Sequence, residues 1–310
     1  MGAFAGARPR VVAFSAMPAI RTEQLSKRYG STLALDALDL EVREGEVYGY
    51  LGPNGAGKTT TIRLLLGLHR ASSGRAELFG VDCWQNPVAA HRRVAFVAGE
   101  PFLWPSLTAA ETLEFLGRLH GGTDRVYRDA LLERFELDLS KKVRALSKGN
   151  RQKVQLIAAL ATRADLLLLD EPTSGLDPLM EKAFRDTVQE ARDRGQTLFL
   201  SSHILSEVEA LCDRVGILRA GRLVDQGTLA ELRHLSAQTV EATFEGDVPE
   251  LPALPGVTVT PAGPSRLRFE VTGEIGPLIA ALAGHRVATL TSREPSLEEI
   301  FLHHYDDGRG

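Results

Sequence analysis

The sequence predicts an α/β fold built on a parallel sheet whose strands end at a ligand site, and three observations support this prediction. A glycine-rich loop at residues 52–59 follows a strand-like segment and opens a helical one. The apolar run at 166–170 ends in an acidic pair. A helical segment separates this run from another strand-like segment at 197–203, and strands alternating with helices in this order favour a parallel sheet.

The composition is that of an ordinary globular protein. The 310 residues are 44% hydrophobic and 25% charged, and a net charge of −4 gives no general attraction for nucleic acid. Cys83 and Cys212 lack CxxC spacing and neighbouring histidines, which argues against a disulfide framework or a zinc site and fits a cytoplasmic setting. No apolar run approaches the roughly 20 residues that a membrane-spanning helix needs.

Changes in composition along the chain divide it into three parts. Residues 1–17 are expected to be a disordered leader, or to precede a start codon at Met17, because their apolar stretch is too short for a signal peptide. The main domain is expected at 18–234, with a helical subdomain at about 100–162. From 235 to 310, prolines surround short β-like runs, which predicts a small α+β accessory domain.

Local signals define the first elements of the main domain. Residues 20–52 read as strands with Gly45 in a turn, and the apolar spacing after the glycine-rich loop predicts a helix over 59–70. A capping box, Thr108-Ala-Ala-Glu111, begins another helix, and a further helical pattern covers 126–135. These two patterns predict the helical insert.

Capping residues also define the later helices. The helix between the strand-like runs has Asp177 as its N-cap, Pro178 at its first position and Gly195 beyond its end. An amphipathic segment at 275–282 predicts the helix of the accessory domain.

The glycine-rich loop fits the pattern GxxxxGK[ST] and predicts a phosphate site. Its residues are Gly52, Pro53, Asn54, Gly55, Ala56, Gly57, Lys58 and Thr59. The glycines let consecutive backbone N–H groups converge on phosphate oxygens, and the helix N-terminus adds partial positive charge. Lys58 supplies a full charge, and Thr59 can place a hydroxyl on Mg²⁺. The alternative is a glycine turn before an ordinary helix.

Three polar side chains are expected at the same sheet edge. Asp170 is placed to hold Mg²⁺, and Glu171 could orient or deprotonate the water that attacks the γ-phosphate. His203, after the next buried strand, is expected to contact the γ-phosphate. The alternatives are a pair of acids that merely caps a strand and a histidine satisfied within the core.

The segment 146–152, Leu-Ser-Lys-Gly-Asn-Arg-Gln, narrows the choice among nucleotide hydrolases. It resembles the LSGGQ signature of the ABC (ATP-binding-cassette) ATPases. The pattern of that family continues in Ser174-Gly-Leu-Asp177, in His203 and in Tyr29 before the first domain strand. The resemblance spans residues 20–227 with every motif in the family order, and the combination is highly specific.

This resemblance implies a P-loop NTPase (RecA-like) parallel-sheet core with an N-terminal antiparallel β subdomain and a helical insert. It also implies hydrolysis of ATP to ADP and phosphate with Mg²⁺, Tyr29 stacked on adenine, and phosphates bound as far as Thr60. Two ATPs would be sandwiched in a two-fold homodimer or pseudo-symmetric heterodimer. The residues implied to meet the ATP of the partner subunit are Ser147, Lys148, Gly149, Asn150 and Asp177.

The sequence departs from the family pattern at two places. Lys148 and Asn150 replace the first glycine and the glutamine of the LSGGQ signature, and we expect activity to survive because Ser147 and Gly149 remain. Gly99 stands where the family usually has a glutamine that touches Mg²⁺. Glu100 could replace it as a hard oxygen ligand or leave that contact unmade.

The resemblance further implies a polytopic membrane permease as partner and a peripheral location on the inner face of the cell membrane. Residues 101–113 would face the permease, where Phe102, Leu103 and Trp104 either form an exposed apolar patch or pack into the core. The tail, ending in residues 294–305, is similar to that of two-component drug, antibiotic or lipid exporters. His303 and His304 lack further metal ligands near them in the sequence. A solvated helix end is therefore favoured over a metal site.

Two other classes compete with a transporter subunit. A soluble ABC protein acting on ribosomes or DNA would normally show a second cassette, a long coiled-coil insert or strongly basic segments, and none of these is present. A regulator that binds ATP without hydrolysing it is disfavoured, because all the residues that hydrolysis needs are intact: Lys58, Thr59, Asp170, Glu171 and His203.

Overall fold

The computed structural model describes residues 17–234, 238–293 and 296–306, and the side chains of 234 and 302–306 are not among the described parts. The predictions for the leader before Met17 and for the tail histidines therefore lie outside the described residues and side chains. No helix within the described ranges is both long and apolar enough to span a bilayer.

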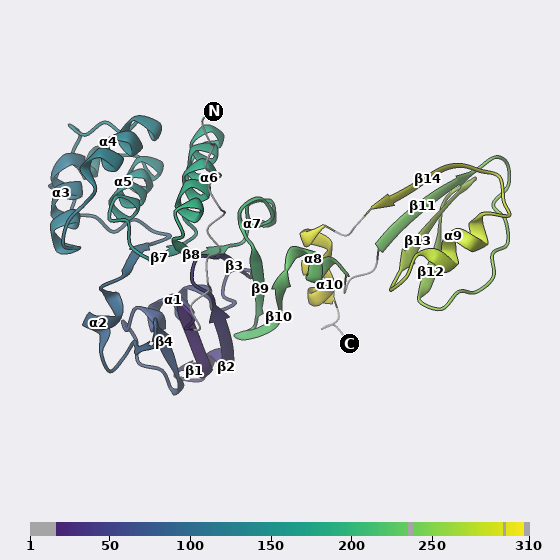
Figure 1. Cartoon of the computed structure of the whole chain (residues 1–310), viewed down its shortest axis with the longest axis horizontal. Coiled ribbons are helices and arrows are strands. Elements are labelled where there is room, and N and C mark those ends of the chain that lie inside the picture. The colour runs from purple at the N-terminus through teal and green to yellow at the C-terminus, as the bar shows by residue number, and fades with distance from the viewer. Residues whose placement is uncertain (1–16, 235–237, 294–295, 307–310) are drawn as a thin grey trace, which may run out of the picture.

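A six-stranded sheet forms the centre of the main domain (Figure 1). Its strand order is β10-β9-β3-β8-β7-β6, and all neighbours pair in parallel except β10 with β9. The bounds are β3 Val47–Leu51, β6 Val94–Val97, β7 Leu166–Asp170, β8 Thr197–Ser202, β9 Arg214–Arg219 and β10 Arg222–Thr228. Every residue of β3, β7 and β8 is buried, as expected for central strands with apolar side chains on both faces. The predicted parallel core is confirmed.

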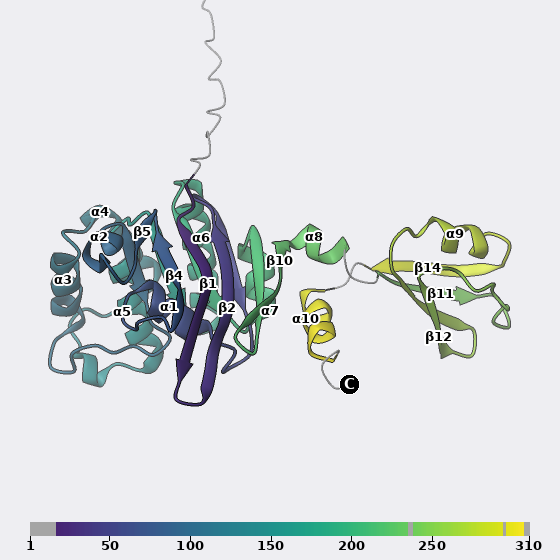
Figure 2. The same cartoon turned by 90° about the horizontal axis from the view of Figure 1, so that it is seen from below.

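An antiparallel sheet lies beside this core, and Figure 2 shows its long strands β1 and β2 edge to edge. It contains β1 Ile20–Tyr29, β2 Thr32–Val42, β4 Ser73–Leu78 and β5 Val81–Asp82. Gly45 has φ +80° in the turn after β2, as predicted. The apolar faces of β1, β2 and β4 pack with α1 (Lys58–Leu65) and one face of the central sheet.

The helix after the phosphate loop is shorter than predicted. Our expectation of a helix over 59–70 was wrong at its C-terminal end, because α1 ends at Leu65. The backbone turns left-handed at Gly67 (φ +57°), and the N–H of Gly67 bonds to the carbonyl of Leu64. A left-handed glycine is a common way for a helix to end. A Cβ on Gly67 would also lie 2.5 Å from the Cys83 carbonyl oxygen.

The helical insert packs on the other face of the sheet (Figure 1). It consists of α3 Ala109–Leu119, α4 Arg125–Arg134, a 3₁₀ turn Val143–Ala145 and α5 Lys148–Leu160, and it follows the short helix α2 Pro87–His91. The capping box at Thr108 and Glu111 is present with both hydrogen bonds. The predicted cap of α6 (Pro178–Asp193) is also confirmed, since the Asp177 carboxylate accepts from two backbone N–H groups.

The C-terminal part forms its own sheet and core, and its last helix returns to the main domain. The sheet order is β12-β13-β11-β14, with bounds β11 Gln238–Phe244, β12 Val257–Gly263, β13 Arg266–Val271 and β14 Val287–Arg293. Helix α9 (Gly276–Leu282) covers one face of it. Helix α10 (Leu297–Asp306) contacts α7 (Leu205–Leu211) and α8 (Leu229–His234), and both views show it apart from the sheet.

Candidate functional site

The phosphate loop joins β3 to α1 and requires glycine at its turns. Gly55 and Gly57 have φ +81° and +117°, a region that favours glycine. At Gly57 a Cβ would also lie 2.7 Å from the Ala34 carbonyl oxygen. The Lys58 side chain is only 5% exposed, and its Nζ donates to the carbonyls of Gly52 (2.6 Å) and Pro53 (3.3 Å). The ammonium therefore lies within the curve of the loop.

The two predicted carboxylates lie beside this loop at the end of β7. Asp170 accepts hydrogen bonds from the Thr59 hydroxyl at 2.9 Å and from the Ser201 hydroxyl. The next residue, Glu171, has a left-handed backbone (φ +44°). This conformation is uncommon for residues other than glycine, and strained residues of this kind are often found at functional sites. Its Oε1 lies 3.4 Å from Lys58 Nζ.

His203 completes this arrangement from the neighbouring strand. It follows the last residue of β8, and its Nδ1 lies 3.2 Å from Glu171 Oε1. Its side chain is 50% exposed, so it borders solvent rather than the core. The structure therefore joins Lys58, Glu171 and His203 in one connected cluster, and β7 and β8 are adjacent parallel strands that bring their carboxyl ends together.

The signature segment forms a second centre. Ser147 is the N-cap of α5 and accepts from the Asn150 N–H at 3.2 Å. Lys148 Nζ donates to the Ser174 hydroxyl at 2.9 Å, and a Cβ on Gly149 would lie 2.3 Å from the Gly175 carbonyl oxygen. The signature thus packs tightly on the loop that ends at Asp177. Within the described ranges, no hydrogen bond or ion pair joins residues 147–150 to the phosphate loop of the same chain.

Tyr29 and Glu100 lie outside these hydrogen-bond networks. The Tyr29 ring is 40% exposed at the end of β1, with Lys27 Nζ 4.9 Å from its centroid and its hydroxyl 3.4 Å from His69 Nδ1. The Glu100 side chain is exposed and makes no hydrogen bond or ion pair with any described residue. Gly99 approaches the site, since a Cβ there would lie 3.1 Å from the Asp170 carbonyl oxygen.

Two residues that the sequence analysis did not select also support the site. Ser201 binds Asp170 through its hydroxyl and the Glu171 N–H through its carbonyl, at 3.0 Å. Gln152, fully buried on α5, donates to the Pro172 carbonyl at 3.1 Å. The polar pair that ends the apolar run at 197–202 could have indicated Ser201. Nothing local distinguishes Gln152 from a surface glutamine.

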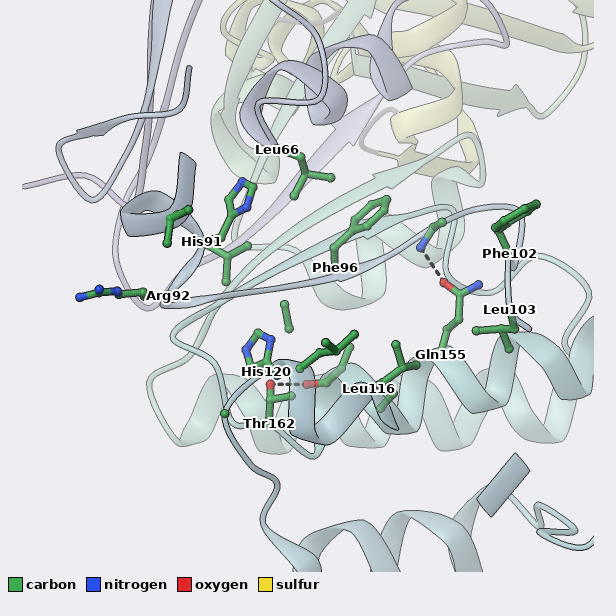
Figure 3. Close-up of a pocket in the computed structure, with 18 residues that line it drawn as sticks. Leu66, His91, Arg92, Phe96, Phe102, Leu103, Leu116, His120, Gln155 and Thr162 are labelled. Atoms are coloured by element: carbon green, nitrogen blue, oxygen red, sulfur yellow. Dashed lines mark hydrogen bonds between the residues drawn. The ribbon is translucent and has the colours of Figure 1, made fainter. Parts of the chain in front are cut away.

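A groove separates the helical insert from α2 and β6. It encloses about 760 Å³, and Figure 3 shows Phe96, Phe102 and Leu116 along it with His91 and His120 at one end. Burial lowers the pKa of both histidines, which favours their neutral forms. The groove is therefore mainly apolar.

The three apolar residues 102–104, which the sequence analysis assigned to a patch or to the core, behave differently. The Phe102 side chain is 98% exposed, whereas Leu103 packs against the main core. Trp104 is 47% exposed and packs edge to face on Phe115, with ring centroids 4.8 Å apart. The apolar patch therefore consists of Phe102 and Trp104, and the alternative of core packing applies to Leu103.

Comparisons with known proteins agree with these features. A family model described as "ABC transporter" matches residues 35–174, and one described as "ATP-binding protein DrrA1-3-like, C-terminal domain" matches 227–305. The daunorubicin resistance ATP-binding protein DrrA3 of Streptomyces coeruleorubidus is 38% identical over 309 residues, covering 94% of this chain and 97% of that protein.

Two further proteins are similar to this chain over its main domain. The bacitracin transport ATP-binding protein BcrA of Bacillus licheniformis is 40% identical over 225 residues, covering 72% of this chain and 74% of that protein. A solved structure of the ATP-binding subunit of an ABC transporter is 33% identical with a TM-score of 0.65, covering 69% of this chain and 92% of that one.

Proposed function

The chain belongs to the family of ABC transporter ATP-binding subunits, and from this premise we propose that it powers an exporter through ATP-driven closure of a dimer beneath a separate membrane permease. As a member of that family it binds and hydrolyses ATP. The observation that carries the proposal is the cluster of Lys58, Glu171 and His203 beside the pair of Thr59 and Asp170. One relative is a drug-resistance protein and another a bacitracin transport protein, which supports export.

In the proposed reaction, the phosphates occupy the loop of residues 52–60. Backbone N–H groups and Lys58 bind their oxygens. Glu171 is held between Lys58 and His203, where it accepts a proton from the attacking water. The water oxygen bonds to the γ-phosphorus as the bond to the β-phosphate oxygen breaks, which gives ADP and phosphate. His203 contacts the γ-phosphate from the solvent side.

The donor chemistry at this edge also fits Mg²⁺. A hydroxyl and a carboxylate are hard oxygen donors, and Thr59 and Asp170 present one of each within 2.9 Å. The ion would neutralise charge on the β- and γ-phosphate oxygens. Among the described residues, no three acidic, histidine or cysteine side chains gather into a metal cluster, so water and phosphate would complete the coordination.

The signature segment is proposed to act on the ATP of the second subunit. Ser147 and the first N–H groups of α5 form a site for an anion at a helix N-terminus, and Lys148 adds a cation there. Asp177 lies at the end of the adjoining loop and would align the two sites. Each ATP then contacts both chains, so nucleotide binding favours closure and loss of the γ-phosphate reopens the dimer. The dimer is a homodimer or a pseudo-symmetric heterodimer.

The exposed patch of Phe102 and Trp104 is proposed to bind the permease. Phe102 lines the apolar groove, and exposed apolar surface of this kind commonly marks a protein interface. Docking there places the chain on the inner face of the cell membrane.

Glu171→Gln tests the proposed reaction. We expect retained ATP binding, ATP-dependent dimers in size-exclusion chromatography, and turnover reduced by roughly 10²–10⁴-fold, the usual contribution of a general base. Glu133→Gln, at an exposed position of α4, is the matched control and should turn over like the wild type. Unchanged turnover of Glu171→Gln would remove this residue from the mechanism.

A pull-down tests the transporter assignment. Tagged Glu171→Gln protein with ATP is added to detergent-solubilised membranes of the native cell. Recovery of one polytopic membrane protein is the expected result. Recovery of ribosomes or DNA without a membrane protein would contradict the proposal.

A further inference from the structure

The turn that carries His203 is closed by one buried and one partly buried hydrogen bond. The Ser202 hydroxyl accepts from the Ile204 N–H at 3.0 Å and donates to Glu207 Oε2 at 2.9 Å. Ser202 is 2% exposed and Glu207 is 7% exposed. His203 lies between Ser202 and Ile204, so the first bond spans it and the second ties the turn to α7. The path of the backbone at His203 thus depends on the Glu207 carboxylate.

Glu207 also lies beside the loop that follows Glu171. A cavity of about 170 Å³ is lined by both Glu207 and Thr173, together with Glu181 and Arg185 from α6. Glu207 Oε1 is buried in this region and has no hydrogen-bond partner among the described residues. The two loops that hold the proposed catalytic residues therefore meet at one carboxylate.

Burying the Glu207 carboxyl lowers the stability of the fold, so its presence here calls for a role other than packing. Burial raises the pKa of its carboxyl and the nearby Glu181 adds to the rise, whereas Ser202, Thr173 and Arg185 oppose it. A buried carboxylate destabilises a fold unless its oxygens are bound. An apolar side chain would pack into the same place without this penalty, but it could not accept the Ser202 hydrogen bond.

We propose that Glu207 is a positioning residue for ATP hydrolysis, and that its carboxylate sets the turn that holds His203 against Glu171. The inference rests on the proposed roles of Glu171 and His203. Glu207 acts through Ser202 and need not touch the nucleotide. Its removal frees the turn, so the Nδ1 of His203 no longer stays 3.2 Å from the Glu171 carboxylate.

The test compares Glu207→Ala with Glu207→Gln in the full chain, measuring ATP turnover and the affinity for a fluorescent ATP analogue. Glu207→Ala should lower kcat by roughly tenfold to ~10²-fold, because misplacing a catalytic group by about 1 Å can cost ~10²-fold in rate. The KM should stay within about twofold of the wild-type value. Glu207→Gln should retain most of the rate, because an amide oxygen can still accept from Ser202. Glu209→Gln is the control: this acid lies on the same helix but binds Arg233 and the Leu297 N–H.

Ser202→Ala removes the same bond from its other side and should reproduce the loss in kcat. Because Ser202→Ala already removes the bond to Glu207, together with the bond from the Ile204 N–H, the double variant should be no slower than Ser202→Ala alone. Three results would overturn the inference. They are a double variant whose loss in kcat is the sum of the two single losses, a wild-type kcat for Glu207→Ala, and equal impairment of Glu207→Ala and Glu207→Gln. Glu171→Gln is assayed in parallel: if it hydrolyses ATP normally the proposed reaction fails, whereas if it alone is inactive only the role of Glu207 fails.

Discussion

Replacing Gly149 by alanine tests whether the signature must pack directly on the loop that ends at Asp177. Gly149 lies in the first turn of α5, where helix propensity alone would favour alanine by up to about 1 kcal/mol. The added Cβ would lie 2.3 Å from the Gly175 carbonyl oxygen, about 1.1 Å short of ordinary contact. This oxygen belongs to the backbone and cannot rotate away, and overpacking typically costs about 1–3 kcal/mol. The steric cost therefore exceeds the gain in propensity.

We expect Gly149→Ala to lower the free energy of unfolding by up to about 2 kcal/mol and to displace the loop by about 1 Å. A shift of that size at a reacting group can cost ~10²-fold in rate. Urea unfolding and steady-state ATP turnover measure the two effects. Gly284→Ala is the control, because a Cβ there meets nothing within 4 Å. Wild-type turnover together with a more stable Gly149→Ala protein would refute the reasoning.

Three further outcomes follow from the structure. Trp104→Ala should keep the basal ATPase rate of the isolated subunit but reduce recovery of the permease, and equal recovery of both forms would show that Trp104 is not part of the interface. Glu207→Gln should gain stability over wild type as the pH rises. The folded-state pKa of Glu207 lies above its ordinary value of 4.5, so the unfolded chain loses this proton first and wild-type stability falls between the two pKa values. Melting temperatures of both proteins from pH 4 to 8 check this, and a constant difference contradicts it. Gly99→Gln requires a shift of only a few tenths of an ångström beside the Asp170 carbonyl and should lower the Mg²⁺ concentration for half-maximal turnover, whereas an unchanged requirement would mean that this position does not reach the ion.

Much of the fold could be predicted because its signals are local. The buried strand β7 is a run of four leucines and an aspartate, and the cap at Asp177 depends on residues next to it in sequence. The end of α1 was misjudged because apolar spacing continues past Leu65, whereas the chain turns at Gly67 to pass the Cys83 carbonyl. That contact joins distant segments and leaves no local pattern, so Gly67 itself was the one local signal for this helix end.

The same distinction applies to the candidate site. The phosphate loop and the acidic pair could be predicted because each is a contiguous motif at a strand end. The bond between Lys148 and Ser174 and the approach of Gln152 to Pro172 could not, because they bring together segments 20 or more residues apart. The left-handed backbone of Glu171 was also unexpected, since nothing in its side chain favours that conformation.

The return of α10 makes the C-terminal sheet an insertion between two attachment points rather than a tail. Leu297 and Ile300 are buried in the core of the main domain, and the Leu297 N–H binds Glu209 on α7. Ending the chain after α8 would therefore expose the hydrophobic surface of the main domain that Leu297 and Ile300 cover. Removing only residues 238–293 and joining the two ends would leave this surface covered. The C-terminal sheet can therefore be replaced by a different module without exposing the core of the main domain. The last helix, α10, cannot be replaced in this way, because it covers that core.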